Sequence, residues 1–134
     1  RNKEIENMFF DKRPTKYVLI AGSRDFEDYR TAKKYIDFCL KNIRKQYKII
    51  IISGGAKGAD KLGERYAHEN RMKCIYYYPD WERYGKGAGP RRNSEMVKKA
   101  DYVICFWDGK SRGTRSTVDF TKQMKKPLRI KYII

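Results

Sequence analysis

Residues 48–60, KIIIISGGAKGAD, run from an unbroken apolar stretch into a loop with three glycines. Four consecutive isoleucines suit a strand in a sheet that is covered on both faces. The apolar positions that follow recur at helical spacing: Ala59, Leu62, Tyr66 and Ala67. A buried strand, a glycine-rich turn and a helix in this order are typical of a parallel α/β sheet.

The same alternation extends to both sides of this stretch. Four further apolar runs predict strands: KYVLIAG (16–22), KCIYYYPD (73–80), DYVICFWDG (101–109) and LRIKYII (128–134). Helical spacing predicts helices over 29–43, from Pro90 to residue 100 and over 114–125, with a glycine-rich loop at 81–89: these segments separate the strands. We therefore expect one Rossmann-like, three-layer α/β domain with a mostly parallel five-stranded sheet over 15–134, preceded by an N-terminal arm at 1–14.

The composition indicates a folded and strongly basic domain. Lys and Arg number 32 against 16 for Asp and Glu, which gives a formal net charge of +16. Such an excess attracts nucleic acid or other polyanions, although a lysine-rich surface without such a partner is the alternative. The sequence has no apolar run of membrane-spanning length and no signal-peptide features, so no membrane contact is expected. The three cysteines lack metal-site spacing, which favours reduced core thiols in a cytoplasmic protein.

Ligands of open parallel sheets bind beyond the carboxyl ends of the strands. Each loop expected at that edge combines glycine with a cation: GSRD (22–25), SGGAKGAD (53–60), PDWERYGKGAGPRRN (79–93) and WDGKSRGTRST (107–117). Glycine lets the backbone approach an anion, and the helix that follows presents free N–H groups. Any one of these loops could be a simple tight turn, but together they predict an anion-binding edge. Loop 53–60 has neither the Walker pattern nor the dinucleotide fingerprint.

The same loops also carry acids and aromatic residues. Asp80 and Asp108 directly follow strands and are favoured for ribose binding or general-base chemistry, whereas helix capping is the expected role of Asp60. Three aromatic residues could stack on a nucleobase, with core or rim packing as the alternative: Trp81, Tyr84 and Trp107.

Five stretches, taken together, resemble the YspA-type, YpsA-related proteins of the SLOG superfamily. These are VLIAGSRDF (18–26), ISGGAKGAD (52–60), PDWERYGKGAG (79–89), RRNSEM (91–96) and FWDGKSRGT (106–114), within a resemblance that spans residues 17 to about 126. The resemblance implies a Rossmann-like domain that binds nucleotides or ADP-ribose-like ligands. The first half, with GSR, SGGAKGAD and YAHE, is also similar to the DNA-processing protein DprA, which implies single-stranded DNA binding.

The second half is similar to the Lonely Guy phosphoribohydrolases, whose pattern is an RKxxM helix followed by PGGxGTxxE. Arg92 matches the catalytic arginine of that pattern, and Asn93 replaces its lysine. Gly113 and Thr114 match the phosphate-binding Gly-Thr pair. Thr117 stands where the catalytic glutamate belongs. The resemblance therefore implies a phosphate clamp, without the acid that would cleave a glycosidic bond.

The leading hypothesis is binding of a phosphorylated ribose compound, a nucleotide or an ADP-ribose derivative, with no cofactor and no metal site. The expected ligand- and phosphate-binding residues are Gly22, Ser23, Arg24, Ser53, Gly54, Gly55, Lys57, Asp60, Arg92, Gly113 and Thr114. One alternative is a nucleotide N-glycosidase or hydrolase with Asp80, Asp108 and Arg92 as catalytic residues. The other is weak single-stranded nucleic-acid binding along the same basic edge. Self-association is an expectation from the resemblance alone.

Overall fold

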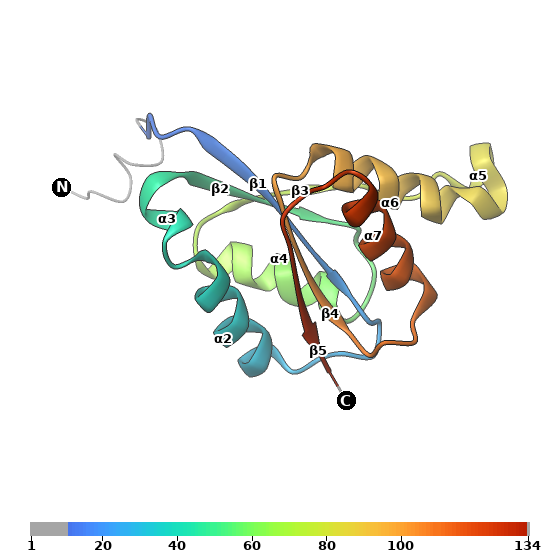
Figure 1. Ribbon diagram of the computed structural model, residues 1–134, viewed down its shortest axis with the longest axis horizontal. Helices are drawn as coiled ribbons and strands as arrows, with labels where there is room; N and C mark the ends of the chain where they lie inside the picture. Colours follow the sequence, from blue (N-terminus) through green and yellow to red (C-terminus); the bar gives the residue numbers. More distant parts are fainter. Residues whose placement is uncertain (1–10, 134) are drawn as a thin grey trace.

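The structure, a computed structural model, describes residues 11–133 and is built on one sheet of five parallel strands (Figure 1). The strands are β1 (Thr15–Gly22), β2 (Lys48–Ser53), β3 (Lys73–Tyr76), β4 (Tyr102–Trp107) and β5 (Leu128–Tyr132). Their order across the sheet is β3-β2-β1-β4-β5, and every neighbouring pair is parallel. The predicted fold class is confirmed, and the sheet is parallel throughout.

Helices cover both faces of the sheet, which makes three layers (Figure 1). One face carries α2 (Tyr29–Leu40), α3 (Ile43–Gln46) and α4 (Ala59–Glu69). The other carries α6 (Ala88–Lys99) and α7 (Arg112–Gln123). The short helix α5 (Trp81–Tyr84) and the 3₁₀ turn η1 (Gly85–Gly87) precede α6 and project from the end of the molecule (Figure 1).

The central strand β1 divides the core in two because its side chains alternate across the sheet. Val18 and Ile20 pack with the α2 and α4 side chains, while Leu19 and Ala21 pack with those of α6 and α7. Of the isoleucine run, Ile51 and Ile52 likewise lie on opposite faces, and both are fully buried. Coverage on both faces explains why these strands are apolar at every position rather than at alternate ones.

Two predicted boundaries are wrong. The glycine-rich stretch 81–89, predicted as a loop, forms α5 and η1 and begins α6. The carboxylate of Asp80 accepts a hydrogen bond from Arg83 N (3.1 Å) and so caps α5. The predicted helix 29–43 ends at Leu40, and Ile43 starts α3 while packing against the same core.

The predicted arm falls largely outside the described residues, since residues 1–10 are not among them. The described residues that precede β1 are hydrogen-bonded to the rest of the domain: Lys48 N donates to Pro14 O (2.9 Å). The guanidinium of Arg13 also donates to Arg44 O. Between residues 11 and 133, no helix has both the length and the apolar character needed to cross a membrane.

Candidate ligand-binding site

A cavity of about 400 Å³ opens at the carboxyl ends of β1 and β4. The strand order reverses between these two neighbours, because the chain builds β2 and β3 on one side of β1 and β4 and β5 on the other. Ligands of doubly wound sheets bind at such a switch point. The wall comes from the loops after β1, β2 and β4 and from α4, α6 and α7.

Most of the predicted site residues meet at this cavity. Those that line it are Gly22, Ser23, Arg24, Lys57, Asp60, Arg92, Asp108, Gly113 and Thr114. The residues from the start of loop 53–60 and the acid after β3 do not line it: Ser53, Gly54, Gly55 and Asp80.

The floor of the cavity depends on the absence of a side chain at Gly22. A Cβ there would lie 2.1 Å from Phe106 O, and the residue has φ +157°. This close approach lets Ser23 N donate to Phe106 O (2.8 Å) while Ser23 Oγ accepts from Asp108 N (3.2 Å). The loops after β1 and β4 are thereby joined directly beneath the cavity.

The loop after β2 is held against the loop after β1 in a similar way. Ala59 N donates to Ser23 O (3.1 Å), and Gly58, with φ +76°, leaves no room for a Cβ, which would lie 2.4 Å from that same oxygen. Ser53 supports the loop from below, because its Oγ accepts from Gly55 N (3.0 Å) and donates to Glu64 Oε2 (2.6 Å). The structure thus gives Ser53 contacts within the loop and not with the cavity.

Arg92 of α6 reaches across the end of the sheet. Its Nη1 donates to Gly54 O (2.7 Å) and Tyr77 O (3.2 Å), and its Nε donates to Asn93 Oδ1 (2.9 Å). Burial lowers the pKa of Arg92, but a guanidinium remains charged at any physiological pH. A half-buried, oriented cation therefore stands in the cavity wall and also ties α6 to the segments after β2 and β3.

The first turn of α7 forms another part of the wall. Ser111 caps this helix: its Oγ accepts from Thr114 N (3.4 Å) and donates to Thr114 Oγ1 (2.8 Å). The Asp108 carboxylate accepts from Ser111 N and Lys110 N, at 2.8 Å each, and these bonds lower its pKa. The Asp108 carboxylate is consequently held in its ionised form, in which it accepts the backbone hydrogen bonds of this turn.

Thr117 stands where the Lonely Guy pattern has its catalytic glutamate, and among residues 112–123 of α7 no acid lines the cavity in place of that glutamate. Thr117 is buried in the cavity wall, and its Oγ1 donates to Gly113 O (3.4 Å). On the facing helix, Asn93 Nδ2 donates to the same carbonyl (3.4 Å). These two side chains brace the first turn of α7 and carry no titratable group.

Two aspartates differ from the roles that their local sequence favoured, although Asp60 is also among the expected ligand-binding residues. Asp80, favoured for ligand chemistry, caps α5 away from the cavity. Asp60, expected as a helix cap, does not cap α4: its Oδ2 accepts from Ala56 N (3.1 Å), and its side chain lines the cavity. Burial raises the pKa of Asp60 to about 6.

The three candidate stacking residues also have different surroundings. Trp107 is 7% exposed and its Nε1 donates to Ser111 O (3.1 Å), so it belongs to the core. The guanidinium of Arg91 lies 4.1 Å from the centre of the Tyr84 ring, which occupies one face of that ring. Trp81 is 58% exposed on α5. Of these three residues, Trp81 is the one that is largely exposed.

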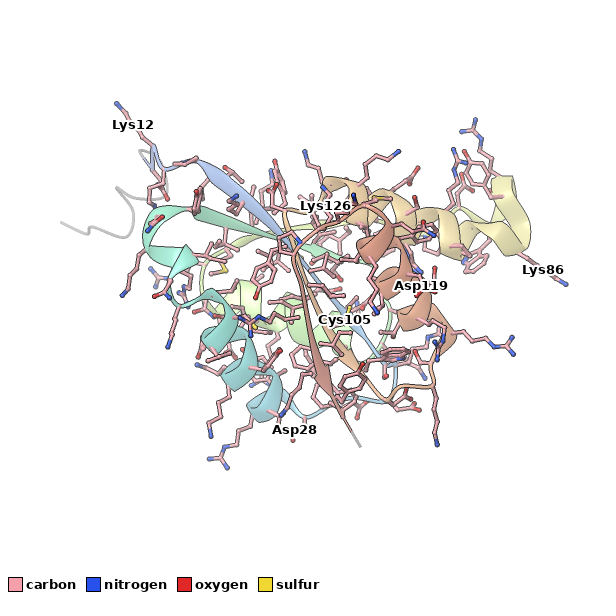
Figure 2. The ribbon with its side chains drawn as sticks, viewed as in Figure 1. Lys12, Asp28, Lys86, Cys105, Asp119 and Lys126 are labelled. Atoms are coloured by element: carbon pink, nitrogen blue, oxygen red, sulfur yellow. The ribbon has the colours of Figure 1, made fainter. Side chains whose placement is uncertain are left out.

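Not every predicted cation meets the cavity. Arg24, Lys57, Arg92 and Arg112 line it; Lys86, Arg91, Lys110 and Arg115 do not. Figure 2 shows Lys86 at the outer tip of the α5–η1 projection, pointing away from the sheet. Sequence reasoning missed Ser111, although serine is strongly preferred at a helix N-cap and its place before α7 could have indicated it.

Comparison with known proteins gives a close relative. The Gene 61 protein of Mycobacterium phage D29 is 39% identical over 104 residues, which are 73% of this chain and 82% of that protein.

Solved structures share the fold. The chain superposes on DprA of Streptococcus pneumoniae with a TM-score of 0.66 and 19% identity, covering 89% of this chain and 50% of DprA. It superposes on DprA of Helicobacter pylori, a structure described for its single-stranded DNA binding mode, with a TM-score of 0.64 and 23% identity, over 88% and 65% of the two chains. For TM1055, a structural-genomics target, the TM-score is 0.61 with 17% identity, over 85% and 72%. The chain thus spans about half to two thirds of the DprA proteins, and these likenesses concern the fold.

The family described as YspA, cpYpsA-related SLOG (YAcAr) matches residues 16–84. That segment contains β1, the loop 53–60 with its glycines, and the chain up to the end of α5. On this match, together with the sheet order and the cavity at its switch point, the chain belongs to the YspA, cpYpsA-related SLOG family.

Proposed function

We propose that this chain binds a phosphorylated ribose compound, a nucleotide or an ADP-ribose derivative, in the cavity between β1 and β4. The observation that carries the proposal is the convergence of four cations on a cavity at the switch point: Arg24, Lys57, Arg92 and Arg112. A volume of about 400 Å³ falls within the usual range of small-molecule sites.

The first turn of α7 is the expected phosphate site. The first N–H groups of a helix lack intrahelical acceptors, and together with the helix dipole they favour an anion. Gly113 has no side chain to block this approach, and nothing lies within 4 Å of where its Cβ would be. Thr114 adds a hydroxyl, and Arg92 of α6 lines the same cavity. Backbone amides, a hydroxyl and a guanidinium would then share the charge of the phosphate.

Arg92→Ala and Thr114→Val test this assignment by calorimetric titration with AMP and with ADP-ribose. Each change is expected to weaken binding by about 1.5–3 kcal/mol, the range for a hydrogen bond to a charged group. Arg92→Ala should also lower the melting temperature, because its Nη1 bonds to Gly54 O and Tyr77 O are lost. Arg91→Ala is the matched control, since this neighbouring arginine lies over Tyr84 and outside the cavity. Undiminished affinity in both cavity variants would refute the phosphate site.

Turnover is less well supported than binding. Glycosidic hydrolysis requires a general acid or base near the reacting bond. Thr117 stands in place of the glutamate, and the ionised Asp108 already accepts two backbone hydrogen bonds. We therefore place ligand binding first and N-glycosidase or hydrolase activity behind it.

A second candidate function is single-stranded nucleic-acid binding. It is favoured by the exposed Trp81 on α5, by the net charge of +16 and by the fold shared with a DprA described for its single-stranded DNA binding mode. An exposed indole can stack on any base, and scattered cations neutralise phosphates without reading sequence. Such binding would be weak and mainly electrostatic.

Salt separates the two candidates. For a single-stranded oligonucleotide, log K is expected to fall with log salt by about 0.7 per neutralised phosphate, so that binding is largely lost by roughly 200 mM salt. Binding of AMP should depend on salt far less steeply. Fluorescence anisotropy with labelled oligothymidylate measures the affinity for the oligonucleotide and its dependence on salt. The measurement compares wild type, Trp81→Ala and the control Phe38→Ala. Phe38 is a suitable control because it is 54% exposed on α2, away from this edge. Tight binding that survives the higher salt and is lost only in Trp81→Ala would place the nucleic-acid function first.

A further inference from the structure

The cavity that we assign to an anion contains a buried acid. Asp60 is only 6% exposed, yet its side chain lines the cavity beside the expected phosphate site. Within the described part of the chain, its carboxylate accepts one hydrogen bond, from Ala56 N to Oδ2. The loop thus fixes Oδ2, whereas the other carboxyl oxygen, Oδ1, is available to a ligand in the cavity.

Arg92 approaches this acid without forming an ion pair with it. Gly54 lies between the two side chains: a Cβ on it would be 2.9 Å from both Arg92 Nη1 and Asp60 Oδ2. Arg92 nevertheless directs Nη1 to the carbonyl oxygens of Gly54 and Tyr77. Among residues 11–133, Asp60 takes part in no ion pair. The guanidinium and the carboxyl group therefore remain two separate functional groups.

Charged groups face Asp60 from each element around it. On α4, Glu64 raises the pKa of Asp60 and Lys61 lowers it, and Arg92 of α6 also lowers it. The surrounding loops add further charges to the cavity: Arg24, Asp25, Lys57, Asp108 and Arg112. From β4, the buried thiol of Cys105 (labelled in Figure 2) is neutral, since burial and Asp60 raise its pKa to about 12. Burial outweighs these opposing charges and brings the pKa of Asp60 to about 6.

We propose that Asp60 binds the anionic ligand in its protonated form, donating its carboxyl proton to a phosphate oxygen, so that ligand binding takes up one proton from solvent. This inference rests on the proposed function. An ionised carboxylate can only accept hydrogen bonds and repels a phosphate, whereas a carboxylic acid has an O–H to donate. Three acids line the cavity: Asp25, Asp60 and Asp108. Protonation of Asp60 removes one of their negative charges.

The direction of the pH effect follows from linkage. A bound anion stabilises the neutral acid and raises its pKa further above the value in the free protein. Affinity should then be constant at low pH. It should fall as the pH rises above the pKa of the Asp60 carboxyl group in the free protein, and the fall should approach about tenfold per pH unit. The proposed site thereby binds its ligand more tightly in mildly acidic conditions.

Isothermal titration with ADP-ribose tests the inference directly. The diphosphate of ADP-ribose does not titrate near neutral pH, unlike a phosphate monoester, whose second pKa is about 6. Titrations in two buffers of different protonation enthalpy give the number of protons taken up. Wild type and the control Asp119→Asn, which alters an exposed acid of α7 (Figure 2), are expected to take up close to one proton at neutral pH.

Asp60→Asn replaces the acid with a neutral amide of the same shape, whose N–H₂ donates at every pH. This variant is expected to bind without proton uptake, and to bind more tightly than wild type by about a hundredfold at a pH two units above the carboxyl pKa. Wild-type binding that takes up no proton, or affinity that stays constant with pH, would overturn the inference and leave the proposed function intact. Failure of the wild type to bind either ADP-ribose or AMP at any pH would overturn both. The wild-type pH series decides the matter even if the variant does not fold.

Discussion

Gly22→Ala is expected to destabilise the fold by about 3 kcal/mol or more, the combined scale of an overpacked core and a strained backbone. The new methyl group would lie 2.1 Å from Phe106 O and 2.8 Å from Ala59 Cβ. Neither neighbour can move aside, because one is the backbone of β4 and the other is the first residue of α4. The change would force β1, β4 and α4 apart at the floor of the cavity. This loss is large, because the free energy of unfolding of a native protein is only about 5–15 kcal/mol.

Urea denaturation followed by circular dichroism measures the effect, with Gly87→Ala as the control. Gly87 has φ −79°, and nothing lies within 4 Å of the position that an alanine methyl group would take, so alanine should fit there without strain. Equal stability of Gly22→Ala and wild type would mean that β1 and β4 do not approach each other as closely as the structure shows.

Asp60→Asn is expected to stabilise the free protein at pH 8 by up to about 3 kcal/mol, and to give no such gain at pH 4. Burial raises the pKa of Asp60 from 3.8 to about 6 in the folded protein. A carboxyl group whose folded pKa lies above its unfolded pKa stabilises the folded state fully below the unfolded value. That contribution is lost as the pH rises through the folded value. The asparagine variant removes this loss because its side chain does not ionise.

Thermal unfolding of wild type, Asp60→Asn and Asp119→Asn over this pH range isolates the contribution of Asp60. The exposed Asp119 carries the same charge, so its variant controls for the change in net charge. A stability difference between Asp60→Asn and wild type that does not vary with pH would show that the buried carboxyl group titrates at an ordinary value. The proton-uptake inference would then lose its basis as well.

The order of elements was predictable because its signals are local. The isoleucines at 49–52 and the apolar run at 18–21 identify the buried strands, and the helical spacing after each glycine-rich loop identifies the helices. Parallel strands joined by helices bring their carboxyl ends to one edge, so the convergence of loops 22–25, 53–60 and 107–117 also followed. The short helix α5 was missed, because the glycines at 85, 87 and 89 favoured a loop and concealed the cap at Asp80.

The sequence by itself determined the α/β class, the parallel sheet and the edge at which the glycine-rich basic loops gather, because periodicity and loop chemistry are read within a few residues. Only the tertiary structure decided that Asp60 lines the cavity while Asp80 does not. Asp60 and Asp80 each stand at or near the start of a helix, so their local patterns are alike. Their difference arises from packing between segments distant in sequence: Asp60 is buried in the cavity that Arg92 of α6 also lines, while Asp80 caps α5 outside that cavity. Burial depends on these long-range contacts, and burial is what gives Asp60 its raised pKa.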